Sequence, residues 1–167
     1  MIKQSFCVIS FYFAVITKIL KEKIRNLSLE NDAIFTGLRS DVNDLLQVMD
    51  AFVFPSLYEG MPLALIEAQA SGIQCYISDR VISKEVKITD LVHFISLKQE
   101  ASEWAEKIFS NKEKALKREN MLKNIVDAGF DIEDTKNELV EFYTSLYTGG
   151  KQNETQKTIF NNFNTNL

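Results

Sequence analysis

Short, largely apolar runs alternate with segments of helical periodicity along the middle of the chain. Residues 51–54, 74–77 and 92–95 have the length and composition of buried strands. Before and between these runs, apolar residues recur at helical spacing, as in residues 42–49. Strands that alternate with helices are typical of parallel βαβ units. The pattern therefore predicts an α/β fold, in which helices cover both faces of a small Rossmann-like parallel sheet.

The last third of the chain is predicted to be helical. Residues 102–109, 112–128 and 131–147 each place apolar side chains on one face and charged side chains on the other. A Gly-Gly pair then precedes polar, Asn-rich residues without a usable period. We therefore expect one globular domain over residues 21–148 and a disordered tail over residues 149–167.

Residues 1–20 form an atypical apolar segment. An almost unbroken apolar run covers residues 6–16, which is shorter than the roughly 18 residues that a membrane-spanning helix needs. The run resembles the centre of a signal peptide, but no small-residue cleavage site follows it. We favour a buried strand over residues 7–15, or a misplaced apolar end, over a membrane anchor. A charged amphipathic helix is expected next, over residues 19–27.

A further strand is predicted over residues 33–36. Gly37 ends it at a point where a backbone has to turn or to approach a ligand. Either Ser40 or Asp41 is expected to cap the helix that follows, because both side chains can accept a hydrogen bond from the first helical turn.

The stretch 54–72 is expected to connect a strand to a helix through a tight loop. Pro55 stops the strand, and Pro62 suits the first helical position because its missing N–H is not needed there. Gly72 is the expected C-terminal cap. In an open α/β sheet, a loop of this kind lies at the carboxyl ends of the strands, where ligands bind.

Two carboxylates occur in this loop and helix. Glu59 precedes the helix, among backbone N–H groups without intrahelical partners, and Glu67 lies about 7.5 Å along the axis from Pro62. A diphosphate can bind the positive helix N-terminus while the carboxylates accept hydrogen bonds from sugar and ribose hydroxyls. The alternative is that both glutamates are solvated surface residues. Asp79 and Arg80, expected at the same edge, are either ligand neighbours or a surface ion pair.

The composition is that of an ordinary globular protein and excludes a broad nucleic-acid footprint. Of 167 residues, 46% are hydrophobic and 25% are charged, and the net charge is −4. Cys7 and Cys75 lie far apart in apolar contexts, so we expect reduced thiols in a cytosolic protein. His93, the only histidine, lies in an apolar run, which favours a structural role. No spacing typical of a metal site occurs, and we expect no metal.

The residues around the two glutamates resemble the signature of a known enzyme family. Residues 54–68 read FPSLYEGMPLALIEA, in which seven residues separate Glu59 from Glu67. The resemblance covers about residues 34–108. Further matching segments are 35–37, 41–46, 50–54, 77–80, 84–86 and 103–105. The chain is similar here to the family 4 retaining glycosyltransferases (glycosyl transferases group 1), and within them to the capsular and exopolysaccharide branch.

This resemblance implies the C-terminal half of a two-domain GT-B fold, which binds a nucleotide-diphosphate sugar. It implies that Glu59 binds the donor sugar and that Glu67 binds the ribose. The backbone that would hold the diphosphate belongs to Gly60, Met61, Pro62 and Leu63. The residues near the base would be Gly37, Leu38 and Arg39. Enzymes of this class work without a bound metal or another cofactor.

The family also implies the reaction, which is hexosyl transfer from the nucleotide sugar to a saccharide or lipid-linked acceptor. Its setting would be cell-surface polysaccharide biosynthesis, in the cytoplasm or at the inner face of the membrane. We expect the acceptor domain to be absent from this chain, and residues 14–19 contain no glycine where the family has its first turn. We therefore expect a chain truncated at its N-terminus, with little activity alone. The alternative is a non-catalytic remnant or one half of a split enzyme that needs a partner chain.

Overall fold

The computed structural model divides the chain into two compact units. The residues that it describes are 8–9, 14–80, 84–115 and 118–147. The first unit, residues 1–125, contains the sheet, and the second, residues 126–167, contains the helix α7 (Ile132–Tyr147). The predicted tail over residues 149–167 lies outside the described residues, and the predicted domain limits stay predictions.

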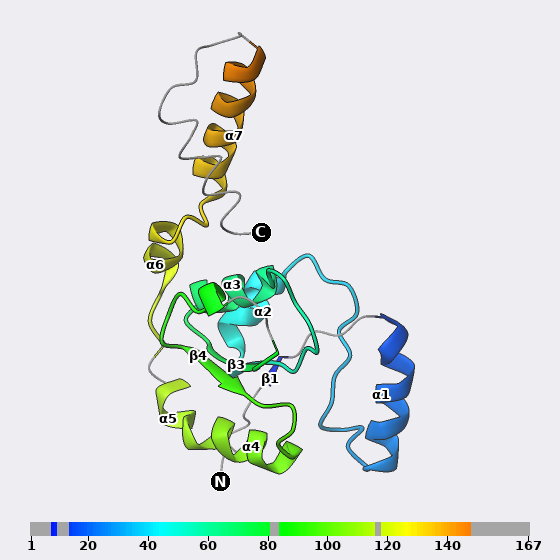
Figure 1. The fold of residues 1–167 in the computed structure, drawn as a ribbon. Coiled ribbons are helices and arrows are strands. Elements are labelled where there is room, and N and C mark those ends of the chain that lie inside the picture. Colours follow the sequence, from blue (N-terminus) through cyan, green and yellow to red (C-terminus); the bar gives the residue numbers. More distant parts are fainter. Residues whose placement is uncertain (1–7, 10–13, 81–83, 116–117, 148–167) are drawn as a thin grey trace. The chain divides into compact units, whose positions relative to one another are not determined.

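Four parallel strands form the described sheet, in the order β1-β2-β3-β4 (Figure 1). They are β1 (Val8–Ile9), β2 (Ala51–Phe54), β3 (Gln74–Ser78) and β4 (Val92–Ile95). Phe52 pairs with Cys75, and Cys75 pairs with Val92. The predicted parallel sheet is confirmed, and its middle predicted strand extends by one residue to Ser78.

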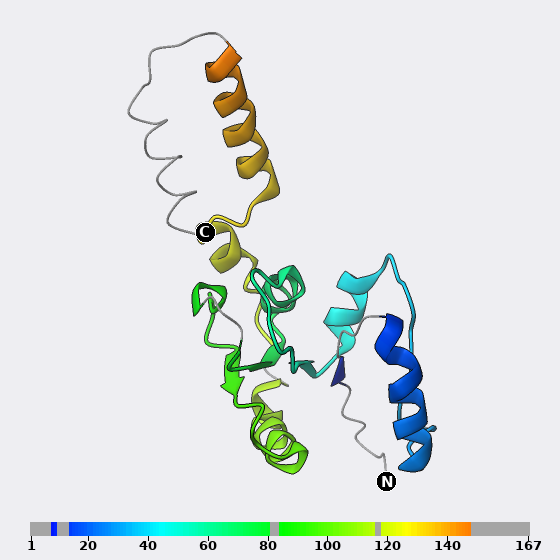
Figure 2. The same ribbon diagram turned by 45° about the vertical axis from the view of Figure 1, so that its right-hand side comes forward.

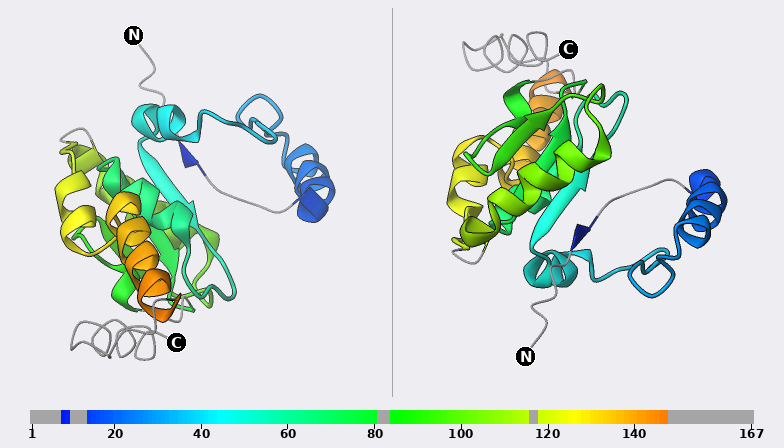
Figure 3. Two further views of the ribbon diagram at one scale, coloured as in Figure 1. Left: turned by 90° about the horizontal axis from the view of Figure 1, so that it is seen from above. Right: turned by 90° about the horizontal axis from the view of Figure 1, so that it is seen from below.

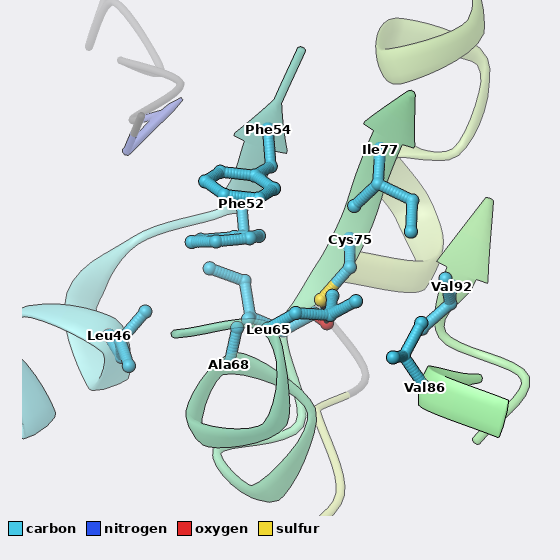
Figure 4. Close-up of a cluster of buried hydrophobic side chains, with 10 residues drawn as sticks. Leu46, Phe52, Phe54, Leu65, Ala68, Cys75, Ile77, Val86 and Val92 are labelled. Atoms are coloured by element: carbon cyan, nitrogen blue, oxygen red, sulfur yellow. Dashed lines mark hydrogen bonds between the residues drawn. The ribbon is translucent and has the colours of Figure 1, made fainter. Parts of the chain in front are cut away.

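Alternating side chains along the strands build an apolar core on each face of the sheet. The core on the first face joins the strands to α2 (Val42–Val48) and α3 (Leu63–Ala70). Its buried members include Leu46, Phe52, Phe54, Leu65, Ala68, Cys75, Ile77 and Val92 (Figure 4). On the other face, Tyr76 packs with Trp104 and Ile108 of α4 (Ala101–Ser110). Figure 3 shows helices on both sides of the strands, which confirms the predicted layers.

The N-terminal apolar run is not one strand. Of residues 7–15, Val8 and Ile9 are in β1, whereas Ala14 begins the helix α1 (Ala14–Asn26), and the residues in between lie outside the described part. The helix predicted over residues 19–27 is confirmed and begins earlier. Within the described residues, no helix is long and apolar enough to cross a membrane.

The strand predicted over residues 33–36 is wrong. None of the strands in the described residues pairs with this segment, and the Ile34 side chain is 89% exposed. The ring of Phe35 instead lies under Lys21 of α1, whose Nζ is 5.3 Å from the ring centroid. A short apolar run can form a strand only beside a partner strand, and this segment has none among the residues that the structure describes.

The single helix predicted over residues 112–128 is also wrong. Two short helices replace it, α5 (Lys112–Ala115) and α6 (Leu122–Asp127). Between them, the Arg118 side chain donates to the carbonyl groups of Leu46, at 2.9 Å, and Gln47 in the last turn of α2, and to that of its C-cap Met49. The Met121 N–H donates to the carbonyl of Ala70, the last residue of α3, at 3.3 Å. These bonds satisfy the ends of two other helices and hold residues 118–121 out of a helix.

In the second unit, α7 is one continuous helix (Figure 2). Asp131 caps it, because its Oδ1 accepts the Glu133 N–H at 2.7 Å, so the helix begins one residue after its predicted start. The apolar stripe is largely exposed, with Tyr143 at 65% and Leu146 at 62%.

Candidate functional site

The loop over residues 55–62 lies at the carboxyl edge of the sheet, between β2 and α3. Phe54 pairs with Ile77 near the end of β3, so the loop that follows β3 opens on the same edge. Asp79 and Arg80 in that second loop are exposed and form no ion pair with each other. The predicted placement of the two loops is confirmed, whereas the surface ion pair is wrong.

Glu59 is half-buried in the first loop and is held by a serine. The hydroxyl Oγ of Ser56 lies 3.0 Å from Glu59 Oε1 and 3.2 Å from the backbone oxygen of Tyr58. No basic side chain in the described part of the chain forms an ion pair with Glu59. The neighbouring Gly60 is exposed, and a Cβ atom placed there would meet no atom within 4 Å. The backbone beside the carboxylate is therefore open to a ligand.

The N-terminus of α3 has no side-chain cap. Pro62 stands at the N-cap with φ −77°, and its carbonyl accepts the Leu65 N–H at 2.9 Å. The helix thus begins at Leu63, one residue after the predicted start, a difference that helix boundaries commonly show. The side chains of Met61 and Leu63 are exposed. The first N–H groups of a helix have no intrahelical acceptor and carry the positive end of the helix dipole. In α3 this end directly follows the loop that carries Glu59.

Glu67 lies one turn beyond Leu63 on the exposed face of α3. The opposite face, with Leu65 and Ile66, is buried in the first unit. Among the described residues, no basic side chain pairs with Glu67. Both predicted carboxylates are therefore accessible, and their roles stay predictions.

The predicted base-side residues form a segment before α2. Gly37 has φ +66°, and Leu38 is fully exposed. The Nε of Arg39 donates to Asp41 Oδ1 at 2.7 Å, and a second guanidinium nitrogen bonds Oδ2. These hydrogen bonds hold the pKa of Asp41 below its usual range, and they explain why Asp41 makes no side-chain cap on α2. Within the described residues, no hydrogen bond or ion pair joins this segment to residues 55–62.

Gln69, which was not predicted from the sequence, anchors α3 to residues 86–89. Its side chain is fully buried, and its Nε2 donates to the Val86 carbonyl at 2.8 Å. Its Oε1 accepts the N–H groups of Ile88 and Thr89 at 3.1 and 3.0 Å. Gln69 thereby binds the 3₁₀ helix η1 (Lys84–Val86) and the segment after it to α3. The sequence feature that could have identified Gln69 is its spacing of four residues from the apolar Leu65, which places an amide on the apolar face of the helix.

The side chains of His93, Tyr76 and Cys75 pack within the first unit. The Nε2 of His93 lies 2.8 Å from Gln74 Oε1, and its ring stacks on Tyr76 at 5.1 Å. Burial raises the pKa of the Tyr76 hydroxyl and that of the Cys75 thiol. A thiol of this kind is inert. In the part of the chain that is described, no three or more His, Cys, Asp or Glu side chains are placed to hold a metal ion.

Comparison with known proteins gives several similar sequences. The chain is 36% identical over 125 residues to a putative glycosyltransferase EpsF of Bacillus subtilis, a match that covers 74% of this chain and 33% of that protein. It is 31% identical over 113 residues to an N,N'-diacetylbacillosaminyl-diphospho-undecaprenol alpha-1,3-N-acetylgalactosaminyltransferase of Campylobacter jejuni, which covers 68% of this chain and 30% of the relative.

A shorter match concerns an Escherichia coli protein, the UDP-Gal:alpha-D-GlcNAc-diphosphoundecaprenol alpha-1,3-galactosyltransferase. Here the identity is 43% over 54 residues, 32% of this chain and 14% of the relative. The chain thus spans about a third or less of the length of these curated relatives. A family model described as Glycosyl transferases group 1 matches residues 17–129, which include the sheet edge, both glutamates and Gln69. The chain belongs to the glycosyl transferases group 1 family.

Proposed function

We propose that this chain contains the donor-binding part of a retaining glycosyltransferase. The enzyme would transfer a hexosyl group from a nucleotide-diphosphate sugar to a saccharide or lipid-linked acceptor. The observation that carries the proposal is the uncapped N-terminus of α3, with the accessible carboxylates of Glu59 and Glu67 on either side of it in the sequence. Family membership supports it.

The acceptor and the setting follow from the relatives. Two of them carry names that give a diphosphoundecaprenol-linked saccharide as the acceptor. We extend this acceptor class to the present chain and propose a role in cell-surface polysaccharide biosynthesis. Because nucleotide sugars are cytoplasmic metabolites, the reaction would take place in the cytoplasm or at the inner face of the membrane.

Each part of the donor has a proposed partner in the loop and helix. Glu59 accepts hydrogen bonds from sugar hydroxyls, and Glu67 accepts them from the ribose. The amides over residues 60–63, Pro62 excepted, face the diphosphate, where the helix dipole stabilises the charge that grows on the leaving phosphate. The exposed segment over residues 37–39 lies on the base side. This assignment requires no metal and no cofactor.

The magnitudes show why the carboxylates matter. A helix dipole at an exposed site contributes about 0.3–1 kcal/mol, whereas even millimolar binding needs about −4 kcal/mol. A hydrogen bond to a charged group contributes roughly 1.5–3 kcal/mol. Removing the Glu67 carboxylate should therefore weaken nucleotide binding by about tenfold or more.

The test is a titration of the purified chain, followed by NMR, with UDP-galactose, UDP-N-acetylgalactosamine and GDP-mannose. We expect saturable binding of at least one nucleotide sugar. Glu67→Ala should weaken the binding of that nucleotide sugar and of its nucleoside diphosphate alike. Glu59→Gln should weaken the binding of the nucleotide sugar alone. Glu106→Ala, which removes an exposed glutamate of α4 on the other face of the sheet, is the matched control. Absence of binding, or binding unchanged in both site variants, would overturn the proposal.

A further inference from the structure

We propose that Ser56 is a positioning residue, which orients the Glu59 carboxylate and thereby sets the affinity for the sugar end of a nucleotide sugar. The inference rests on the proposed function, because it concerns the carboxylate assigned to the donor sugar. Ser56 lies two residues after β2, directly behind Pro55, whose ring fixes its own backbone angle φ. The hydroxyl is thus attached to a well-defined point at the end of the sheet.

The Ser56 hydroxyl has one proton and two acceptors within reach. Glu59 Oε1 lies 3.0 Å away and the backbone oxygen of Tyr58 lies 3.2 Å away. An ionised carboxylate is the stronger acceptor, and its bond is also the shorter of the two. We therefore assign the proton to Glu59, so that a side-chain hydrogen bond spans three residues and ties the carboxylate to the end of β2.

This bond leaves the second carboxylate oxygen of Glu59 available. Among the described residues, Oε2 has no hydrogen-bond or ion-pair partner. A free glutamate side chain loses rotamer freedom when a ligand orders it, and this loss weakens binding. With Oε1 already held by Ser56, a sugar hydroxyl meets an acceptor whose position is set before the ligand arrives.

The expected consequence is confined to the sugar end of the ligand. Ser56→Ala should weaken binding of the nucleotide sugar about fivefold, as expected for one long side chain that is no longer ordered, and should leave the nucleoside diphosphate unchanged. Ser56→Thr retains a hydroxyl and should restore most of the affinity. Once the whole side chain is removed by Glu59→Ala, which leaves the Ser56 hydroxyl without this acceptor, adding Ser56→Ala should have no further effect on affinity.

The experiment is calorimetric titration of the full chain with the tightest-binding nucleotide sugar of the panel above and, separately, with its nucleoside diphosphate. The control is Ser71→Ala, whose hydroxyl donates to the Ala68 carbonyl at 2.8 Å at the other end of α3. The role of Ser56 would be overturned by equal losses for both ligands, by no loss in Ser56→Ala, or by a loss that persists in the Glu59→Ala background.

A second measurement needs no ligand. Side-chain coupling constants of Glu59 in the unaltered chain should report one dominant χ1 rotamer. In Ser56→Ala the coupling constants should be averaged over several rotamers. Averaged couplings in the unaltered chain would overturn the proposal even where the variant fails to fold. If Glu59→Gln binds the nucleotide sugar normally, the assignment of Glu59 fails and the role of Ser56 in binding fails with it. If Glu59→Gln weakens binding and Ser56→Ala does not, only the present inference fails.

Discussion

Replacing the buried Gln69 with leucine should strongly destabilise the first unit. The Gln69 side chain is fully buried, and its amide group bonds the Val86 carbonyl and the N–H groups of Ile88 and Thr89. The Thr89 hydroxyl also lies 3.1 Å from the same Oε1. Leucine fills a similar volume but leaves all these groups without the partner that they have now.

The magnitude follows from the groups left unpaired. A buried polar group without a partner costs roughly 1–3 kcal/mol. The full penalty applies to the Val86 carbonyl and the Thr89 N–H, because both residues are buried. Ile88 is only half-buried, so water can replace the lost partner of its N–H. We therefore expect a loss of about 4 kcal/mol in the free energy of unfolding. Since a domain has about 5–15 kcal/mol in total, the variant would be close to unfolding.

Urea unfolding followed by the fluorescence of Trp104 measures this loss. Trp104 is the only tryptophan and is buried on the α4 face of the sheet, so its emission reports the first unit. With a typical slope of 1–3 kcal/mol per molar urea, the midpoint should fall by about 2 M. Amide exchange at Ile88 and Thr89 should accelerate, and Gln99→Leu, at an exposed site, should change little. A loss below about 1 kcal/mol with an unchanged slope would refute the reasoning.

Two further predictions concern the backbone and pH. Gly72→Ala should lower the free energy of unfolding by about 3 kcal/mol or more, because φ is +75° and the new Cβ would lie 2.0 Å from the Glu119 carbonyl oxygen. In Gly37→Ala the new Cβ meets no atom within 4 Å, so the loss should be only about 1 kcal/mol. Urea unfolding measures both losses. Equal costs would contradict this account. The lowered pKa of Asp41 means that its pairing with Arg39 stabilises the fold above about pH 4 and that this contribution is lost as pH falls through the lowered pKa. Arg39→Gln should return the Asp41 pKa toward its usual range in an NMR titration, and an unchanged pKa would argue against the pair.

The sheet and the candidate loop could be predicted because their signals are local. Residues 51–54 and 92–95 are short apolar runs, and a proline or a glycine marks each change of element between Pro55 and Gly72. Such features constrain the backbone whatever packs against it. For the same reason, the end of α3 could be placed to within a residue: Ser71 is the C-cap in place of the predicted Gly72, which follows it in a left-handed conformation.

The errors arose where distant contacts decide the local structure. Residues 112–128 have a helical pattern, yet residues 118–121 are not helical in the structure. There the Met121 N–H donates to the Ala70 carbonyl, and the Arg118 side chain donates to the Leu46 carbonyl, 72 residues away. The apolar run over residues 33–36 resembles the true strands in composition, but in the described part of the chain no strand pairs with it. Neither the acceptor of an arginine nor the partner of a strand can be inferred from spacing along one chain.

The two ends of α3 differ in how completely their polar groups are paired, and this difference makes one end a candidate binding site. At the C-terminal end, the N–H groups of Gly72 and Ile73 bond back to the last turn, and the Met121 N–H occupies the carbonyl of Ala70. At the N-terminal end, no side chain caps the helix. Unpaired N–H groups cost little while water reaches them, so this end can stay open without destabilising the free protein. Because the other end is anchored, an anion would meet donors that are already fixed in place, which is the condition for electrostatic stabilisation of a leaving phosphate.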